Sequence, residues 1–333
     1  MFEEIGKDFA VELSTLLAED FDRADYLAAI GNCYSGVLSG DKVGVVPNGV
    51  FGDAVVSQCN PTWGTPKALV NTTWVLGSFM IPKQYCYDTM ASEIKRYEKL
   101  YELSTIDAAK KWISSQVESA FAASVVAKAF FGSTTAADYA STGFEGVNGV
   151  FTQCANYLGS GDADASQATV IGTNTKAWLK TGTNALEAIE NMISDAPTDV
   201  KASENAVIVM NEGFYDALMF NLKVNKGVFI ESQWSALFGG FKATTYNGYK
   251  LVVVPMMDKV LGAMATGDKF KDHPNMALFT TSDNLLFGAS TNEQAGLGSV
   301  DIFDDKNTQT TKAIVKFSLG ALVPNPKGFQ LCY

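Results

Sequence analysis

The seven residues 143–149, GFEGVNG, place a glycine at every third position, and glycine-rich loops of this kind can bind phosphate through backbone amides. Phosphate loops follow a strand and lead into a helix, so that the amides and the helix N-terminus converge on the anion. Here a helical pattern precedes the glycines, and Val150-Phe151-Thr152 follows without the Lys-Ser/Thr pair of a P-loop. We therefore predict a turn that allows close backbone packing, with no nucleotide or other cofactor.

Nucleophilic catalysis by serine or cysteine requires a neighbouring base, and the chain has one histidine, His273, in the polar loop KFKDHPNM. We predict that His273 is a solvated loop residue and that the chain has no catalytic residues. The acidic pairs Glu19-Asp20, Asp162/Asp164 and Asp304-Asp305 could serve as carboxylate catalysts or bind Mg²⁺ or Ca²⁺. Their loop composition favours a solvated surface instead.

The cysteines are five in number and far apart in sequence, with no C-x-x-C pair, and H-E-x-x-H does not occur either. We expect reduced, mostly buried thiols and no metal site. The cysteines are Cys33, Cys59, Cys86, Cys154 and Cys332.

The 333 residues are 47% hydrophobic, which is ample for a large core. Their 25 basic and 36 acidic residues give a net charge of −11. A field of that sign repels nucleic acid and anionic membranes, which argues against a direct DNA reader. The opening residues MFEEIGKDFAVELS do not resemble a signal peptide, and no run approaches the roughly 18 apolar residues of a membrane span.

The clearest element is a rod-like helix over 107–131, with an apolar stripe at helical spacing. Ser104 and Asp107 suit a capping box at its start, and Gly132 suits a left-handed residue at its end. Residues 8–30 predict one or two short amphipathic helices. Residues 41–87 are rich in Val, Thr, Gly and Pro, which predicts two extended arms with a loop around 62–67. The stripe consists of Trp112, Ile113, Val117, Ala120, Phe121, Ser124 and Val125.

The rest of the chain mixes helices and strands without a strict βαβ rhythm. We predict a helix over 184–193 and another that Asn211 caps. Buried strands are predicted over 206–210, 249–255, 276–281 and 284–289, with a loop over 157–169. Residues 299–322 predict a long hairpin around a polar tip, with Ala313, Val315, Phe317 and Leu319 on one face of its return strand.

Taken in order, these elements resemble the major capsid protein of tailed bacteriophages with the HK97 fold. The phrases that carry the resemblance are PKALVNTTWVLGSFMIPKQYCYDTM before the rod, FEGVNGV after it, NAVIVMNEGFYDALM, and YNGYKLVVVPMM followed by NMALFTTSDNLLFG. The resemblance implies an α+β fold with an N-terminal arm over 1–48 and an E-loop over 49–88. It implies a P-domain over 89–140 and 299–322, with a spine helix about 105–131, and an A-domain over 141–298 and 323–333.

The resemblance also implies which residues matter for assembly. It places contacts between subunits at Trp63 and Lys67 of the E-loop and at the hairpin tip, Asp304, Asp305 and Lys306. It makes Gly132, Gly143, Gly146 and Gly149 a structural joint between the spine helix and the A-domain. Some members cross-link an E-loop lysine to a P-domain asparagine beside a glutamate. The strand TQTTKAIVKFSLGA offers neither an asparagine nor an acid, so we predict no cross-link.

The implied function is that of a non-enzymatic shell subunit, which forms homo-pentamers and homo-hexamers of an icosahedral capsid around double-stranded DNA. Implied partners are further copies of the chain and separate scaffold, portal and decoration proteins, without a membrane. The implied location is the virion, after assembly in the bacterial cytoplasm. An encapsulin-type nanocompartment is the alternative with the same fold. A soluble α/β enzyme acting on a phosphorylated substrate is the alternative from another class.

Overall fold

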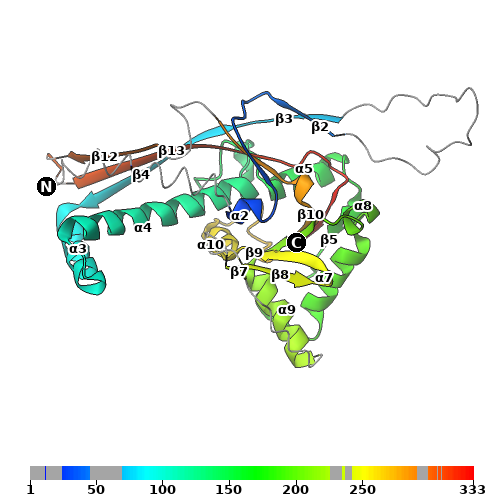
Figure 1. Cartoon of the computed structure of the whole chain (residues 1–333). Helices are drawn as coiled ribbons and strands as arrows, with labels where there is room; N and C mark the ends of the chain where they lie inside the picture. The colour runs from blue at the N-terminus through cyan, green and yellow to red at the C-terminus, as the bar shows by residue number, and fades with distance from the viewer. Residues whose placement is uncertain are drawn as a thin grey trace, which may run out of the picture.

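The computed structural model describes residues 12, 25–45, 70–225, 235–236, 242–290, 299–305, 307–308 and 310–333. A long helix with a narrow sheet along it joins a compact α/β body, and a two-stranded ribbon extends from the junction (Figure 1). The architecture is therefore α+β, as the sequence predicts.

The predicted rod is present as α4, Thr105–Val126, which continues directly into a π-helical turn, η1, Ala127–Phe131. Ser104 caps α4: its hydroxyl accepts from the Asp107 amide at 3.2 Å and donates to the Asp107 carboxylate at 2.6 Å. The predicted stripe is buried at Trp112, Ile113, Val117, Phe121 and Val125. We call residues 105–131 the rod.

A helix that the sequence analysis missed precedes the rod. It is α3, Tyr87–Tyr101, which packs against α4 and ends at Glu102 in a left-handed conformation with φ 54°. The start of α3 has no side-chain cap, because the chain passes from strand β4 straight into the helix at Cys86. Its buried residues, Met90 and Ile94, face the core that includes the rod.

The sheet along the rod, which we call the rod sheet, contains the predicted long hairpin, whose return strand pairs with three other strands while its first strand lies at the edge. The alternate side chains of the return strand are buried as predicted, at Ala313, Val315, Phe317 and Leu319. The Phe317 ring packs on Phe121 of the rod, with centroids 5.1 Å apart. The strands are β1 (Asn32–Ser35), β4 (Gly77–Cys86), β11 (Leu286–Ala289), β12 (Ser299–Asp305) and β13 (Thr310–Leu322).

The α/β body is built on a seven-stranded mixed sheet in the order β5-β14-β10-β6-β9-β8-β7. Its central strand β6 is buried on both faces, which explains the continuous apolar run AVIVM. The predicted strands 206–210 and 276–281 are confirmed, whereas the strand predicted over 249–255 ends at Val253, because Pro255 begins a helix. The strand predicted over 284–289 is present as β11, which starts at Leu286 and belongs to the rod sheet. The strands are β5 (Ala168–Thr169), β6 (Ala206–Met210), β7 (Ser235–Ala236), β8 (Lys242–Tyr246), β9 (Tyr249–Val253), β10 (Ala277–Thr281) and β14 (Phe329–Cys332).

Helices cover both faces of this sheet (Figure 1). One face packs against α6, α7 and α9, while the other packs against α5, α10 and the end of the rod. The predicted helix 184–193 is confirmed as α7. The helices of the body are α5 (Val150–Ser160), α6 (Lys176–Lys180), α7 (Asn184–Asp195), α8 (Thr198–Lys201), α9 (Glu212–Asn225) and α10 (Pro255–Ala263), with 3₁₀ turns at Ala136–Asp138, Ala165–Gln167 and Ser282–Asn284.

The start of α9 corrects one detail of the sequence analysis. The helix begins after Asn211 as predicted, but the Asn211 side chain accepts from the Met276 amide and donates to Asp258. The carboxylate of Asp258, on α10, accepts instead from the amides of Glu212 at 2.7 Å and Gly213 at 3.1 Å. A residue from a different helix therefore caps α9.

The predicted extended arms form an antiparallel ribbon of β2, Lys42–Val45, and β3, Val70–Thr73. The ribbon is anchored where Trp74 is buried with Val37, Leu286 and Leu322. The loop around 62–67 lies outside the described residues. So does most of the predicted amphipathic segment, of which α2, Asp25–Ala28, is described.

Candidate assembly contacts and the joint between rod and α/β body

The joint is the place where the end of the rod, residues 132–141 and the glycine loop, residues 143–149, meet. The Gly149 amide donates to the Gly132 carbonyl at 2.8 Å, and the Ser133 amide donates to the Phe144 carbonyl at 2.9 Å. A Cβ on Gly149 would lie 2.4 Å from the Phe130 carbonyl carbon. A Cβ on Gly132 would lie 2.5 Å from the Val147 carbonyl oxygen. These two glycines let the two backbones touch.

Gly132 does not have the predicted left-handed conformation, since its φ is −51° and its ψ is 152°. It is needed for close approach rather than for unusual dihedrals. Gly143 and Gly146 are the positions with positive φ, at 103° and 99°. A Cβ on Gly146 would also lie 2.9 Å from the Phe79 ring, so the glycine loop rests on the start of β4.

A buried lysine, Lys128, sits inside this joint, and the sequence analysis did not find it. Its Nζ donates to the Glu145 carbonyl at 2.5 Å and lies 3.6 Å from the Glu145 carboxylate. It also lies 4.4 Å from the centroid of the Phe79 ring. Burial lowers the pKa of Lys128, and Glu145 acts against that shift. This one side chain links rod, glycine loop and β4.

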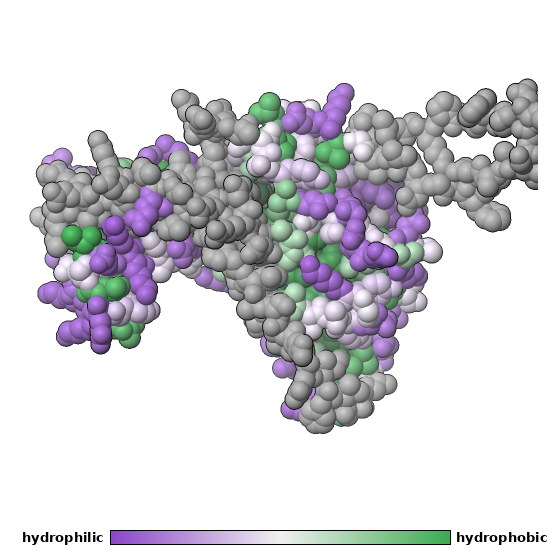
Figure 2. Space-filling model, viewed as in Figure 1, coloured by the Kyte–Doolittle hydropathy of each residue, from purple (hydrophilic) through white to green (hydrophobic). Residues whose placement is uncertain are grey.

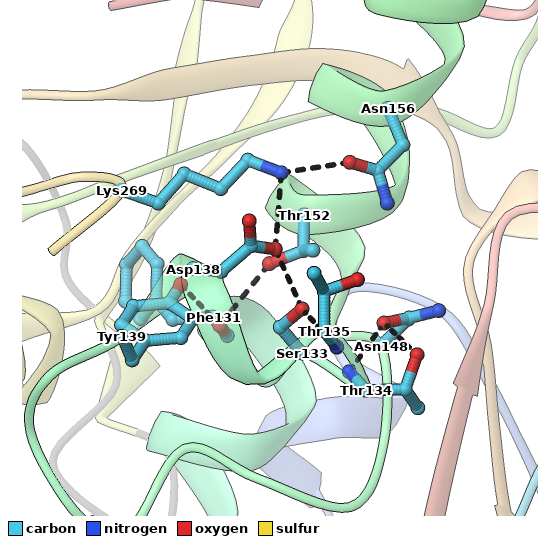
Figure 3. Close-up of polar contacts among 10 residues, drawn as sticks. All are labelled: Phe131, Ser133, Thr134, Thr135, Asp138, Tyr139, Asn148, Thr152, Asn156 and Lys269. Atoms are coloured by element: carbon cyan, nitrogen blue, oxygen red, sulfur yellow. Dashed lines mark hydrogen bonds and ion pairs between the residues drawn. The ribbon is translucent and has the colours of Figure 1, made fainter.

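A polar network fixes residues 132–141 to the α/β body (Figure 3). Asp138 accepts from Ser133 at 2.6 Å and pairs with Lys269 at 3.3 Å. Lys269 also donates to Asn156 on α5 at 2.7 Å. Because these groups come from three separate segments, the network fixes the direction in which the body leaves the rod.

Two further contacts complete the joint. The hydroxyls of Tyr139 and Thr152 both donate to the Phe131 carbonyl at the end of the rod, at 2.5 Å and 3.1 Å (Figure 3). The neighbouring Asp268 accepts from the amides of Ala140 at 2.7 Å and Ala265 at 2.8 Å. The Phe131 carbonyl, left open by the end of the helix, is thus satisfied by side chains that follow the rod in the chain.

The phosphate-loop alternative needs one correction. A helix does follow the glycines, since α5 occupies 150–160, where the sequence analysis predicted a loop from 157 and no helix before it. However, Val150, Phe151 and Thr152 are fully buried. The Phe151 ring stacks on Phe131 with centroids 5.4 Å apart, so the start of α5 has no opening for an anion. The glycine loop is a packing joint.

Of the predicted contact residues, Trp63, Lys67 and Lys306 lie outside the described residues. Asp304 is on β12, where its backbone pairs with Thr311. Asp305 closes the hairpin, because its carboxylate accepts from Lys312 at 2.7 Å and from the Asn307 amide at 3.1 Å.

The hydrogen bond from Lys312 is the main cause that lowers the pKa of Asp305 to about 2. A role for Asp305 in contacts with other subunits remains a prediction.

His273 is not the solvated loop residue predicted. It is half-buried, its ring packs edge-on against Tyr333 at 4.8 Å, and its Nδ1 is buried without a hydrogen bond in the described chain. Burial lowers its pKa, and Asp272 opposes that shift.

The described cysteines are unpaired, with Cys154 and Cys332 buried but Cys33 and Cys86 exposed, so burial is less general than predicted. The described residues contain no cluster of three or more metal-ligating side chains.

Exposed apolar side chains identify surfaces that the described chain leaves uncovered. Leu100, Tyr101 and Ile106 lie at the corner between α3 and α4, and Figure 2 shows hydrophobic patches on this end of the molecule. Met80 is 58% exposed and Phe303 46% exposed on the face of the rod sheet that points away from the rod. Among the described helices, none is long and apolar enough to cross a membrane.

This architecture is the HK97-like capsid fold. A rod with its own sheet carries an extended ribbon, and a glycine loop joins the rod to an α/β body whose sheet has helices on both faces. The fold matches the procapsid of satellite phage P4 that includes the size-determination protein Sid, with TM-score 0.51, 10% identity and 96% of each chain covered. It also matches a structure from Mycobacterium phage Ogopogo, with TM-score 0.55, 12% identity, and 92% of this chain and 90% of that one covered.

A third similar structure is the holo-SrpI encapsulin complex from Synechococcus elongatus, with TM-score 0.44, 12% identity, and 92% of this chain and 86% of that one covered. No family model matches the sequence, and no curated protein does. At these identities the likeness concerns the fold, and the predicted HK97-like fold is confirmed.

Proposed function

We propose that this chain is a major capsid protein, which assembles into pentamers and hexamers of an icosahedral shell around the double-stranded DNA of a tailed phage. The observation that carries the proposal is the match to the P4 procapsid over 96% of both chains.

Unburied surface at the extremities of the chain supports self-assembly. A two-stranded ribbon such as β2–β3 is marginally stable alone in water, so it needs a surface to pack on. Leu100, Met80 and Phe303 are likewise exposed in the described chain. Neighbouring subunits would bury these groups, and association driven by apolar burial would then stabilise the shell.

The acidic charge suits a container for DNA. With a net charge of −11, the wall would repel the phosphate backbone rather than hold it. We further propose that the shell forms without an autocatalytic cross-link and that scaffold, portal and decoration functions belong to separate proteins. Assembly would then take place in the bacterial cytoplasm, and the final location would be the virion.

An encapsulin-type compartment is the alternative with the same fold. The match to the encapsulin structure has a TM-score of 0.44, which is too low to support this alternative. The enzyme alternative required an anion site at the glycine loop, and burial of Val150, Phe151 and Thr152 removes its structural basis. The proposed subunit is therefore not an enzyme.

Size-exclusion chromatography and negative-stain imaging of the purified protein distinguish these functions. The proposal predicts capsomers or closed shells, and neighbouring genes for portal and terminase. Shells that enclose a tagged cargo enzyme would favour the compartment. A stable 35.7 kDa monomer that binds nucleotide would contradict both shell functions.

A further inference from the structure

The chain contains three Asn-Gly pairs, and the structure gives two of them opposite chemical environments. The pairs are 48–49, which lies outside the described residues, 148–149 in the joint, and 247–248 in the turn between β8 and β9. Asn-Gly is a chemically labile sequence because glycine has no side chain to hinder its backbone nitrogen from attacking the asparagine amide.

The turn at Asn247-Gly248 is open. Both residues are exposed and both have positive φ, 50° and 85°, as in the two-residue turns that join hairpin strands. The strands are paired up to Tyr246 and Tyr249, so the two turn residues project beyond the last pair. Within the described chain, no hydrogen bond holds the Asn247 side chain or the Gly248 amide.

The pair Asn148-Gly149 is closed. The Gly149 nitrogen donates to the Gly132 carbonyl at 2.8 Å, so it is not free to attack. The Asn148 side-chain oxygen accepts from the amide and hydroxyl of Thr134, at 2.8 Å and 3.1 Å (Figure 3). Gly149 is also buried against Phe130. Reaction here requires the joint to open first.

We propose that Asn247 is a site of spontaneous deamidation in the folded protein and that the joint protects Asn148 from the same reaction. The Gly248 nitrogen forms a bond to the Asn247 side-chain carbonyl carbon and gives its proton to solvent. The bond from that carbon to the side-chain nitrogen breaks, and ammonia leaves. Water then opens the cyclic imide at either carbonyl, which yields aspartate or isoaspartate.

The two sites would suffer different consequences. At Asn247 the product adds one negative charge per subunit at an exposed turn, a change that a surface position tolerates. At position 148 isoaspartate would lengthen the backbone inside a joint where atoms already touch.

The test is incubation of the full chain at mildly alkaline pH and 37 °C, folded and in urea, followed by peptide mapping by mass spectrometry with isoaspartate detection. In the folded protein we expect conversion at Asn247 to be at least about tenfold faster than at Asn148, since each hydrogen bond that must break lowers the open population. In urea the two sites should convert at similar rates, and Asn247→Gln should remove the signal at 247 alone.

Two results would overturn the proposal. One is conversion of Asn148 as fast as Asn247 in the folded protein. The other is an intact Asn247 in the folded protein under conditions where the urea sample converts.

Discussion

Replacing Gly149 with alanine tests the packing role of the joint. The φ of Gly149 is −73°, which alanine adopts freely, so the substitution adds a clash without backbone strain. The added Cβ would lie 2.4 Å from the Phe130 carbonyl carbon and 2.6 Å from the Phe131 nitrogen. Overpacking costs roughly 1–3 kcal/mol or more, and the backbone shift that relieves the clash would break the buried hydrogen bond from the Gly149 amide to Gly132, which adds roughly 1–3 kcal/mol. We expect a loss of about 2–6 kcal/mol in the free energy of unfolding.

Gly143→Ala is the matched control. Its φ is 103° with nothing within 4 Å of the added Cβ, so it carries backbone strain without a clash. That strain costs about 1–2 kcal/mol. Urea unfolding of dissociated subunits, followed by tryptophan fluorescence at one protein concentration, measures both variants. A Gly149→Ala protein within about 1 kcal/mol of the parent, or less affected than Gly143→Ala, would refute the packing argument.

Three further changes test other parts of the structure. Lys128→Met keeps the aliphatic volume but removes the donor to Glu145, so urea unfolding should show a loss of about 1–3 kcal/mol; an unchanged midpoint would contradict this role. Asp258→Ala should cost about 0.5–2 kcal/mol, with a smaller loss in Asp258→Asn, because the cap of α9 is lost; equal losses in both variants would count against capping. Burial raises the pKa of Cys332 from 9.0 to about 12, so as pH rises the thiol ionises in the unfolded chain before it ionises in the folded one. The free energy of unfolding therefore falls as pH rises above about 9. Cys332→Ala should flatten that fall in pH-dependent unfolding, and an unchanged slope would exclude the thiol as a cause.

Local patterns were sufficient to predict the elements that dominate the fold. The rod, the late hairpin and the central strand β6 each carry a periodicity that burial enforces. Helix α3 also had a signal, in Met90, Ile94 and Tyr97 at helical spacing, but its start lacks a capping side chain. Helix α5 likewise starts without a cap, at Gly149.

The details of the joint depend on contacts between distant segments, which no local pattern reveals. Lys128 is on the rod, yet its burial comes from Glu145 and Phe79. The environment of His273 comes from Tyr333, sixty residues further along the chain. The sequence also suggested a left-handed Gly132, but the conformation of this residue depends on its approach to Val147.

The most direct test of the proposed function is electron cryo-microscopy of the purified chain under assembly conditions, with scaffold supplied if needed. The proposal predicts closed icosahedral particles whose reconstruction contains pentameric and hexameric capsomers, with the rod and α/β body fitting each subunit. A protein that stays a 35.7 kDa monomer at high concentration, with scaffold present, would contradict it.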